Sequence, residues 1–166
     1  RKLFVFGFEV RAYDPYVSES FMHSCGAKKV SIEELLKSSN VVNILTPYTK
    51  DTHHIINKKS LSLMKKDAYL VGVSRGKCID NKALYEALKN GGIAGAALDD
   101  PEEEPMKMEN WSPKYNKLFT LDNCFFTPHT AYASKQSLEE CRRVASENVK
   151  AVLLGEEPFD LVKPTK

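Results

Sequence analysis

The stretch YLVGVSRGKCIDNKALYEALKNGGIAGAAL, residues 69–98, contains the pattern that decides the fold. An apolar run at 69–74 predicts a buried strand, and a second run, rich in small residues, predicts another at 93–98. Between them Asp80 can cap the start of a helix, and Gly91 can end it. Strand, helix and strand in this order predict two neighbouring strands of a parallel sheet joined by a helical crossover.

The same alternation continues in both directions along the chain. The strands are continuous apolar runs joined by short loops, which is typical of a parallel sheet with helices on both faces. We therefore predict a doubly wound α/β fold. The further strands are expected at 9–13, 28–30, 41–46 and 123–127, and the further helices at 18–23, 31–40, 58–64 and 134–154.

The composition excludes several classes of protein. A net charge of +2 on 166 residues gives no reason to expect nucleic acid or a membrane surface as a partner. No apolar run approaches the ~20 residues that a membrane span needs. The cysteines form no C-x-x-C pair, so we expect free, mostly buried thiols, no metal and a cytoplasmic setting. They are Cys25, Cys78, Cys124 and Cys141.

Polar and charged residues stand where the predicted strands end. In open α/β sheets ligands bind beyond the carboxyl ends of the strands, so these residues are expected to converge on one edge of the sheet. This convergence is the main physical indication of a site. The polar and charged residues are Asp14, Thr46, Ser74, Arg75, Asp99, Asp100 and His129, and Pro47 and Pro128 stand beside them at the same strand ends.

Two of these residues allow a functional and a structural interpretation. Asp14 can accept hydrogen bonds from an adenosine ribose, or it can serve only the turn that Asp-Pro begins. His129 has the side chain best suited to proton transfer near neutrality, although a lone histidine at a strand end often has no such role. His53 and His54 lie in a polar loop and are interpreted as surface residues.

Arg75 and the acidic stretch 102–104 are open to the same two interpretations. Arg75 can be a structural ion-pair partner, or its guanidinium can bind a substrate carboxylate through two hydrogen bonds. Gly76 beside it lets a ligand or backbone approach closely. One of the three glutamates can pack against His129 and raise its pKa, but the spacing does not select which one.

The ordered set of motifs resembles one known family over essentially the whole chain. The motifs are YDP, ILTP followed by HHIIN, LSLMKKDAYLVGVSRG, ALDDPEEEP and FTPHTAYAS. Together they resemble the nucleotide-binding domain of the NAD-dependent D-isomer-specific 2-hydroxyacid dehydrogenases. The resemblance implies a Rossmann-type fold, NAD as cofactor, and hydride transfer between NAD(H) and a D-2-hydroxy acid or 2-oxo acid.

The resemblance also implies roles for individual residues. Arg75 matches the arginine that binds the substrate carboxylate, His129 matches the general acid/base, and Glu104 matches the glutamate that orients that histidine. Cofactor contacts are implied for Asp14, Thr46, Pro47, Val73, Ser74, Asp99 and Ala131.

The chain also departs from the family pattern. The G-x-G-x-x-G fingerprint is missing, so we expect residues 1–154 to be an N-terminally truncated NAD-binding domain that lacks its first strand and phosphate-binding turn. Residues 134–166 are expected to be a C-terminal helix and tail that pack toward an absent substrate domain. Residues 1–166 alone are then expected to bind NAD weakly and to be inactive.

Two local features bear on partners. The insertion at 106–120 carries Trp111 and is interpreted as a surface insertion. Tyr132, in HTAYAS, is similar to the branch of C-terminal-binding corepressors, so an NAD-responsive scaffold with little turnover is the alternative function. The family commonly dimerises through this domain, which implies a homodimer, with a small 2-hydroxy or 2-oxo acid as the other partner.

Overall fold

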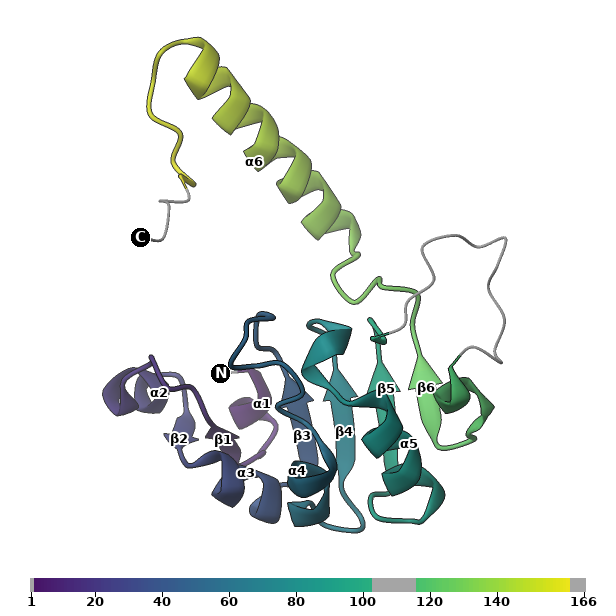
Figure 1. Cartoon of the computed structure of the whole chain (residues 1–166). Helices are drawn as coiled ribbons and strands as arrows, with labels where there is room; N and C mark the ends of the chain where they lie inside the picture. Colours follow the sequence, from purple (N-terminus) through teal and green to yellow (C-terminus); the bar gives the residue numbers. More distant parts are fainter. Residues whose placement is uncertain (1, 103–115, 162–166) are drawn as a thin grey trace. The chain divides into compact units, whose positions relative to one another are not determined.

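The computed structural model describes residues 2–102 and 116–161, and every strand pairing within them is parallel (Figure 1). The strands form a two-stranded sheet, β1-β2, and a four-stranded sheet with the order β3-β4-β5-β6. The parallel α/β prediction is therefore confirmed. The strands are β1 (Val10–Ala12), β2 (Ala27–Lys29), β3 (Val41–Ile44), β4 (Tyr69–Gly72), β5 (Gly95–Leu98) and β6 (Cys124–Phe126).

The helices begin where the sequence places capping residues. Ser31 accepts a hydrogen bond from the Glu34 N–H, and Asp80 accepts bonds from the first turn of its helix. Gly26 and Gly91 follow helices with φ values of +77° and +66°, which glycine adopts without strain. The helices are α1 (Lys2–Val5), α2 (Glu19–Ser24), α3 (Ile32–Ser38), α4 (Lys58–Leu63), α5 (Asn81–Lys89) and α6 (Lys135–Leu153), with short 3₁₀ turns η1 (Gly76–Cys78) and η3 (Lys117–Thr120).

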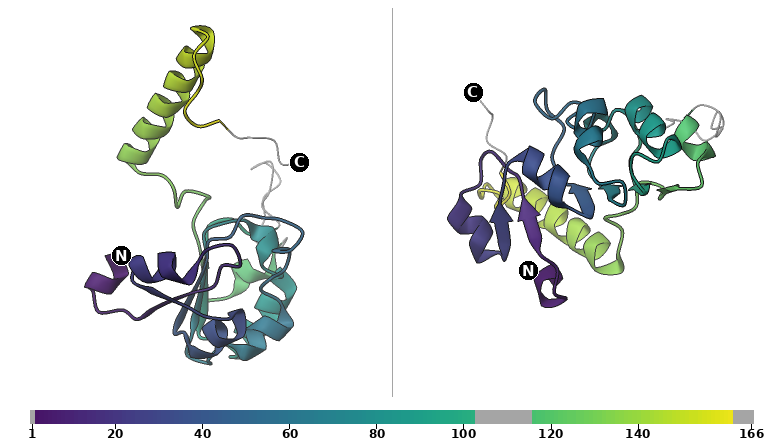
Figure 2. Two further views of the ribbon diagram at one scale, coloured as in Figure 1. Left: turned by 90° about the vertical axis from the view of Figure 1, so that its left-hand side faces the viewer. Right: turned by 90° about the horizontal axis from the view of Figure 1, so that it is seen from below.

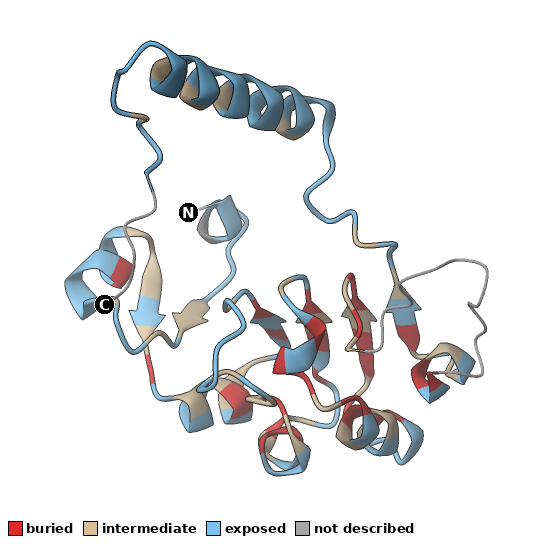
Figure 3. Cartoon of the chain, turned by 45° about the horizontal axis from the view of Figure 1, so that its top comes forward, coloured by how far each residue is buried: buried red, intermediate tan, exposed pale blue. Residues whose placement is uncertain are grey.

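The direction of winding reverses along the chain. β2 lies on the side of β1 away from β3, and from β3 onward each new strand is added on the opposite side (Figures 1 and 3). Parallel crossovers are right-handed, so a reversal of strand order moves the connecting helices to the other face. This reversal is the doubly wound, Rossmann-type topology, and ligand sites form where it occurs.

Among the described residues of the first unit, the helices that pack on the four-stranded sheet lie on one face, not on both as the sequence predicts. In β3 and β4 buried residues alternate with more exposed ones, and Val41, Tyr69 and Phe125 are exposed on the other face. The crossovers from β2 to β5 all proceed in the same direction, so α4 and α5 lie on the same side as α3 (Figure 2). Continuous apolar runs could not distinguish this arrangement from a sheet buried on both faces.

The core lies between that face and the helices α3, α4 and α5. Leu70 from β4 and Leu84 from α5 are fully buried, and Leu36 from α3 is nearly so. Burial of such side chains contributes about 1.5–3 kcal/mol each, so this layer fixes the strands whose ends carry the site.

The chain separates into two compact units, residues 1–129 and 130–166. The domain boundaries expected from the sequence, 1–154 and 134–166, stay predictions. Across the described residues no helix is both long and apolar enough to cross a membrane. All four cysteines are free, but only Cys78 and Cys124 are buried, so the prediction of mostly buried thiols holds for two of them.

Candidate functional site

The carboxyl ends of β3, β4, β5 and β6 form one edge of the larger sheet. Strand register places Gly72 beside Leu98 and Leu98 beside Phe126, so the segments that follow these residues leave the sheet side by side. Arg75 follows β4, Asp99 follows β5 and His129 lies just after β6. The convergence predicted from the sequence is therefore present in the first unit.

A pocket of about 650 Å³ opens at this edge between the ends of β3 and β4. Five of the residues predicted for the site line it, and their neighbours Leu45 and Tyr48, which were not predicted, line it as well. The predicted residues are Thr46, Pro47, Val73, Ser74 and Arg75.

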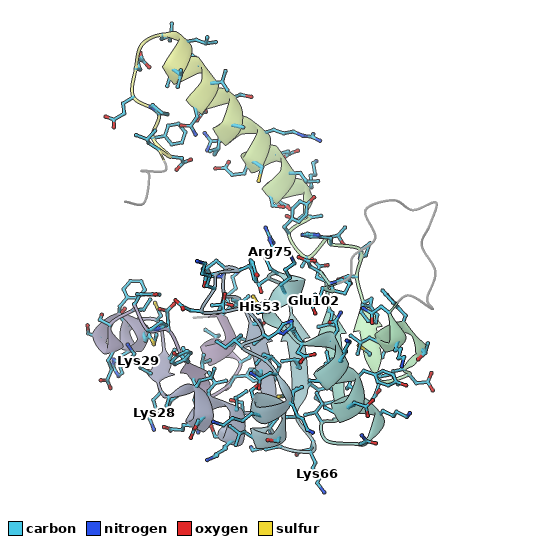
Figure 4. All side chains as sticks on the ribbon, in the orientation of Figure 1. Lys28, Lys29, His53, Lys66, Arg75 and Glu102 are labelled. Carbon is cyan, nitrogen blue, oxygen red and sulfur yellow. The ribbon has the colours of Figure 1, made fainter. Side chains whose placement is uncertain are left out.

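Arg75 presents its side chain to solvent at the mouth of this pocket. Its Nη1 donates a hydrogen bond to the Ser74 carbonyl oxygen at 2.8 Å. It lies immediately before the η1 turn, and the Cys78 N–H donates back to the Arg75 carbonyl at 3.0 Å. The turn fixes the backbone of Arg75, which Figure 4 labels at this edge of the sheet.

Asp99 and His129 are linked through the backbone. The His129 N–H donates to the Asp99 carbonyl at 2.9 Å, and the Thr127 hydroxyl donates to the carboxylate of Asp99, which is only 4% exposed. His129 has φ +52°, a left-handed conformation that a non-glycine residue keeps only when its surroundings hold it. The backbone of His129 is therefore held by the end of β5 as well as by β6, the strand that it follows.

Asp14 serves the turn that follows β1. One of its carboxylate oxygens, Oδ1, accepts hydrogen bonds from the N–H groups of Tyr16 at 2.8 Å and Val17 at 3.2 Å. Within the described residues Oδ2 accepts no hydrogen bond. Asp14 therefore stabilises the turn through Oδ1, and Oδ2 is left for a ligand. The structural interpretation and the ribose-binding interpretation of Asp14 are compatible.

Two predicted site residues are not placed with the others. Glu104 lies outside the described residues, as does most of the insertion at 106–120 with Trp111. Ala131 belongs to the second unit. Of the three candidate glutamates, Glu102 contacts His54 instead: the His54 Nε2 and Glu102 Oε1 atoms are 2.9 Å apart.

The interpretation of His54 as a surface residue is wrong. Its side chain is 31% exposed, it has φ +48°, and it binds a residue 48 positions later in the chain. His53 is exposed, as predicted. A pair of adjacent histidines carries no sequence signal that separates the two, because the contact forms only when the loops after β3 and β5 meet.

Nothing in the described part of the chain gathers three or more potential metal ligands. The site consists instead of an arginine, a histidine, a buried aspartate and a mostly apolar pocket. This combination suits an organic ligand that carries a carboxylate.

Comparison with known proteins identifies the domain. Residues 1–131 match the D-isomer specific 2-hydroxyacid dehydrogenase, NAD binding domain. The chain is 42% identical over 152 residues to a D-3-phosphoglycerate dehydrogenase of Methanocaldococcus jannaschii, covering 91% of this chain and 28% of that protein. It is 40% identical over 157 residues to a glyoxylate reductase of Korarchaeum cryptofilum, covering 95% of this chain and 46% of that protein.

Solved structures give the same result. A D-lactate dehydrogenase from Treponema pallidum superposes with a TM-score of 0.89 at 34% identity, covering 99% of this chain and 51% of that one. A D-lactate dehydrogenase from Aquifex aeolicus, complexed with NAD and lactic acid, gives 0.85 at 36% identity, covering 98% and 52%. The chain thus spans about half the length of these structures, and the extent of these matches shows that it belongs to the NAD-binding domain family of the D-isomer specific 2-hydroxyacid dehydrogenases.

Proposed function

We propose that the protein containing this chain is an NAD-dependent dehydrogenase that interconverts a D-2-hydroxy acid and the corresponding 2-oxo acid. The observation that carries the proposal is the pocket at the ends of β3 and β4, which Arg75 borders together with Thr46 and Ser74. The named relatives are enzymes acting on 2-hydroxy or 2-oxo acids, and nothing in these matches favours the scaffold alternative.

The residues present fit an NAD molecule. Asp14 has a carboxylate oxygen left for ribose hydroxyls, and Thr46 and Pro47 line the pocket beside Val73 and Ser74. Asp99 and Ala131 complete the proposed cofactor contacts. Bound NAD supplies the hydride acceptor or donor, and the chain's own residues supply binding, orientation and proton transfer.

Arg75 binds the substrate in this proposal. Its planar guanidinium can donate two parallel hydrogen bonds to a carboxylate, which fixes both position and orientation. A substrate carboxylate held there lies at the border of the pocket. Binding through the carboxylate alone admits small acids that differ in their other substituents. Because the named relatives act on 2-hydroxy or 2-oxo acids, we propose these acids as the substrate class.

His129 holds the proton that the reaction exchanges with the substrate oxygen. In reduction its protonated imidazole donates to the carbonyl oxygen, and in oxidation the neutral imidazole accepts the hydroxyl proton. The backbone bond to Asp99 keeps the residue at the strand end. We propose, from the family pattern, that Glu104 keeps the imidazole oriented and favours its charged form.

We also propose that the protein is a cytoplasmic homodimer, following the family pattern. Sedimentation of the complete protein tests the oligomeric state directly. A monomer at micromolar concentration, with activity intact, would remove the dimer from the proposal and leave the chemistry unaffected.

The function is tested by kinetics of the complete protein with a panel of 2-oxo acids and NADH. Oxidation of the reduced cofactor is followed by its absorbance. We expect turnover of at least one acid, and a loss of about 10²–10⁴-fold in kcat for His129→Gln, the usual contribution of a general acid. His23→Gln, a substitution in α2, is the matched control and should retain wild-type kcat. Undiminished turnover by the His129 variant would refute the assignment.

A further inference from the structure

Glu102 is held by a histidine from a distant loop at the same edge of the sheet as Arg75. The His54 Nε2 and Glu102 Oε1 atoms are 2.9 Å apart, and the two side chains are 31% and 25% exposed. Figure 4 labels Arg75, His53 and Glu102 at this edge. A partly buried pair between loops is more constrained than a surface ion pair, because less solvent competes for it.

The backbone of His54 is also fixed. Its N–H donates to the Lys77 carbonyl at 2.9 Å, and its own carbonyl accepts from Asn57 Nδ2 at 2.9 Å. Its φ of +48° is uncommon for a side chain with a Cβ. Such a conformation persists only where the surrounding contacts impose it, and such positions concentrate at functional sites.

Three segments meet immediately after Arg75, and we call their meeting point the Arg75 junction: residues 54–56, 76–80 and 101–102. The Ile56 N–H donates to the Cys78 carbonyl at 3.1 Å, which joins the first segment to the second. A Cβ placed on Gly76 would lie 2.3 Å from the Glu102 backbone nitrogen, so the second segment packs directly on the third. The contact between His54 and Glu102 joins the first segment to the third.

The orientation of the Arg75 side chain depends on this junction. Within the described residues, its guanidinium donates a hydrogen bond to the carbonyl of Ser74, the residue next to it. A guanidinium with so local a restraint is directed mainly by the path of its own backbone. That path is set at Gly76, where Glu102 contacts it.

We propose that His54 is a positioning residue that acts through Glu102 to fix the Arg75 turn, and with it the placement of the substrate carboxylate. The inference rests on the proposed function for its consequence in catalysis. Its geometric part, that the pair sets the position of Arg75, stands on the contacts of the junction alone.

The kinetic test uses His54→Ala, Glu102→Ala and the double variant in the complete protein. We expect the KM for the 2-oxo acid to rise about 10-fold in each single variant and no further in the double variant, as coupled residues behave. The dissociation constant for NADH should change less than about 2-fold, because an intact cofactor pocket is unaffected by loss of this coupling. His54→Gln, which can place a donor near the Nε2 position, should restore most of the loss.

Two matched controls separate this effect from general damage. His23→Ala removes an exposed imidazole ring in α2, and Glu34→Ala removes a carboxylate from the remote Lys28–Glu34 ion pair. Both should leave the KM at its wild-type value. Effects of His54→Ala and Glu102→Ala that multiply in the double variant would overturn the proposal.

A second measurement is independent of activity. The side-chain Nε–H resonance of Arg75, assigned through Arg75→Lys in the 166-residue chain, reports the environment of the guanidinium. We expect it to shift in His54→Ala and Glu102→Ala and to stay in place in the two controls. If the complete protein reduces no 2-oxo acid, the proposed function fails, and a shifted resonance still supports the positioning. An unshifted resonance in both variants overturns it, whatever the kinetics show.

Discussion

Arg75 is the residue on which the proposed chemistry depends most directly, and its geometry predicts an asymmetric response to substitution. Lysine keeps the charge but lacks the planar pair of donors, so Arg75→Lys should lose one charge-assisted hydrogen bond. Such bonds contribute about 1.5–3 kcal/mol, which corresponds to about 10- to 150-fold in kcat/KM for the 2-oxo acid. The affinity for NADH should be retained, and an equal loss of NADH affinity would show that Arg75 serves the cofactor instead.

The Cys124 thiol predicts how stability depends on pH. Burial raises its pKa to about 12, because the thiolate is disfavoured away from water. In the unfolded chain the thiol ionises near its ordinary pKa of ~8.5. Above that pH the unfolded state binds fewer protons than the folded state, so stability falls as pH rises from about 8.5 toward 12.

Urea denaturation of the 166-residue chain at pH 8 and pH 10 measures this effect. Cys124→Ala removes the titrating group and should reduce the loss of stability between the two pH values. Cys141→Ala, at an exposed position in α6, should leave that loss unchanged. Equal losses in wild type and the Cys124 variant would show that another group governs the alkaline transition.

Single residues at strand ends could be placed from the sequence, because each follows its strand within a few positions. Arg75 and Asp99 were found in this way, and both lie where expected. The His54–Glu102 contact could not be found, since it joins positions 48 residues apart and depends on how two loops fold over the sheet edge. The contact of the Thr127 hydroxyl with the Asp99 carboxylate could not be predicted either, because it joins the ends of two different strands.

At the scale of the elements, α5 connects the arginine turn to β5, and its first turn depends on Asp80. The Asp80 carboxylate accepts hydrogen bonds from the Lys82 and Ala83 N–H groups, each at 3.0 Å. Asp80→Ala removes the cap and should cost about 0.5–2 kcal/mol of unfolding free energy. Asp80→Asn keeps an acceptor oxygen and should cost much less. Denaturant titration of both variants checks this, and equal costs would mean that the charge, not the cap, stabilises the helix.

Helix boundaries were predictable because caps act locally, whereas coverage of the sheet was not. Ser31, Asp80 and Gly91 mark helix ends from one turn of sequence. The exposure of Tyr69 and Phe125 instead depends on the order in which strands are added, which fixes the side on which each crossover helix lies. Strands of a sheet covered on one face and strands of a sheet covered on both faces can have the same apolar composition.

At the scale of the whole molecule, the two units differ in how much apolar surface they bury. The first unit contains the core formed by α3, α4, α5 and the larger sheet, whereas none of the residues of α6 is buried. Hydrophobic residues such as Val149, Val152 and Leu153 are 59%, 60% and 80% exposed. The sequence predicted α6 as a helix from its apolar stripe, but a stripe does not show what covers it.

This difference predicts a wide spread of hydrogen-exchange protection within the 166-residue chain. A helix that buries no residue is stabilised mainly by its own backbone and by exposed side-chain pairs such as Arg143 with Glu140 and Glu147, which contribute little. Amides of α6 should therefore exchange by local opening, orders of magnitude faster than those of β4 or α5, where Leu70 and Leu84 are fully buried. Mass-spectrometric exchange measures both at once. Equal protection in α6 and β4 would show that the apolar face of α6 is covered in solution, and a concentration dependence of that protection would identify a second copy of the chain as the cover.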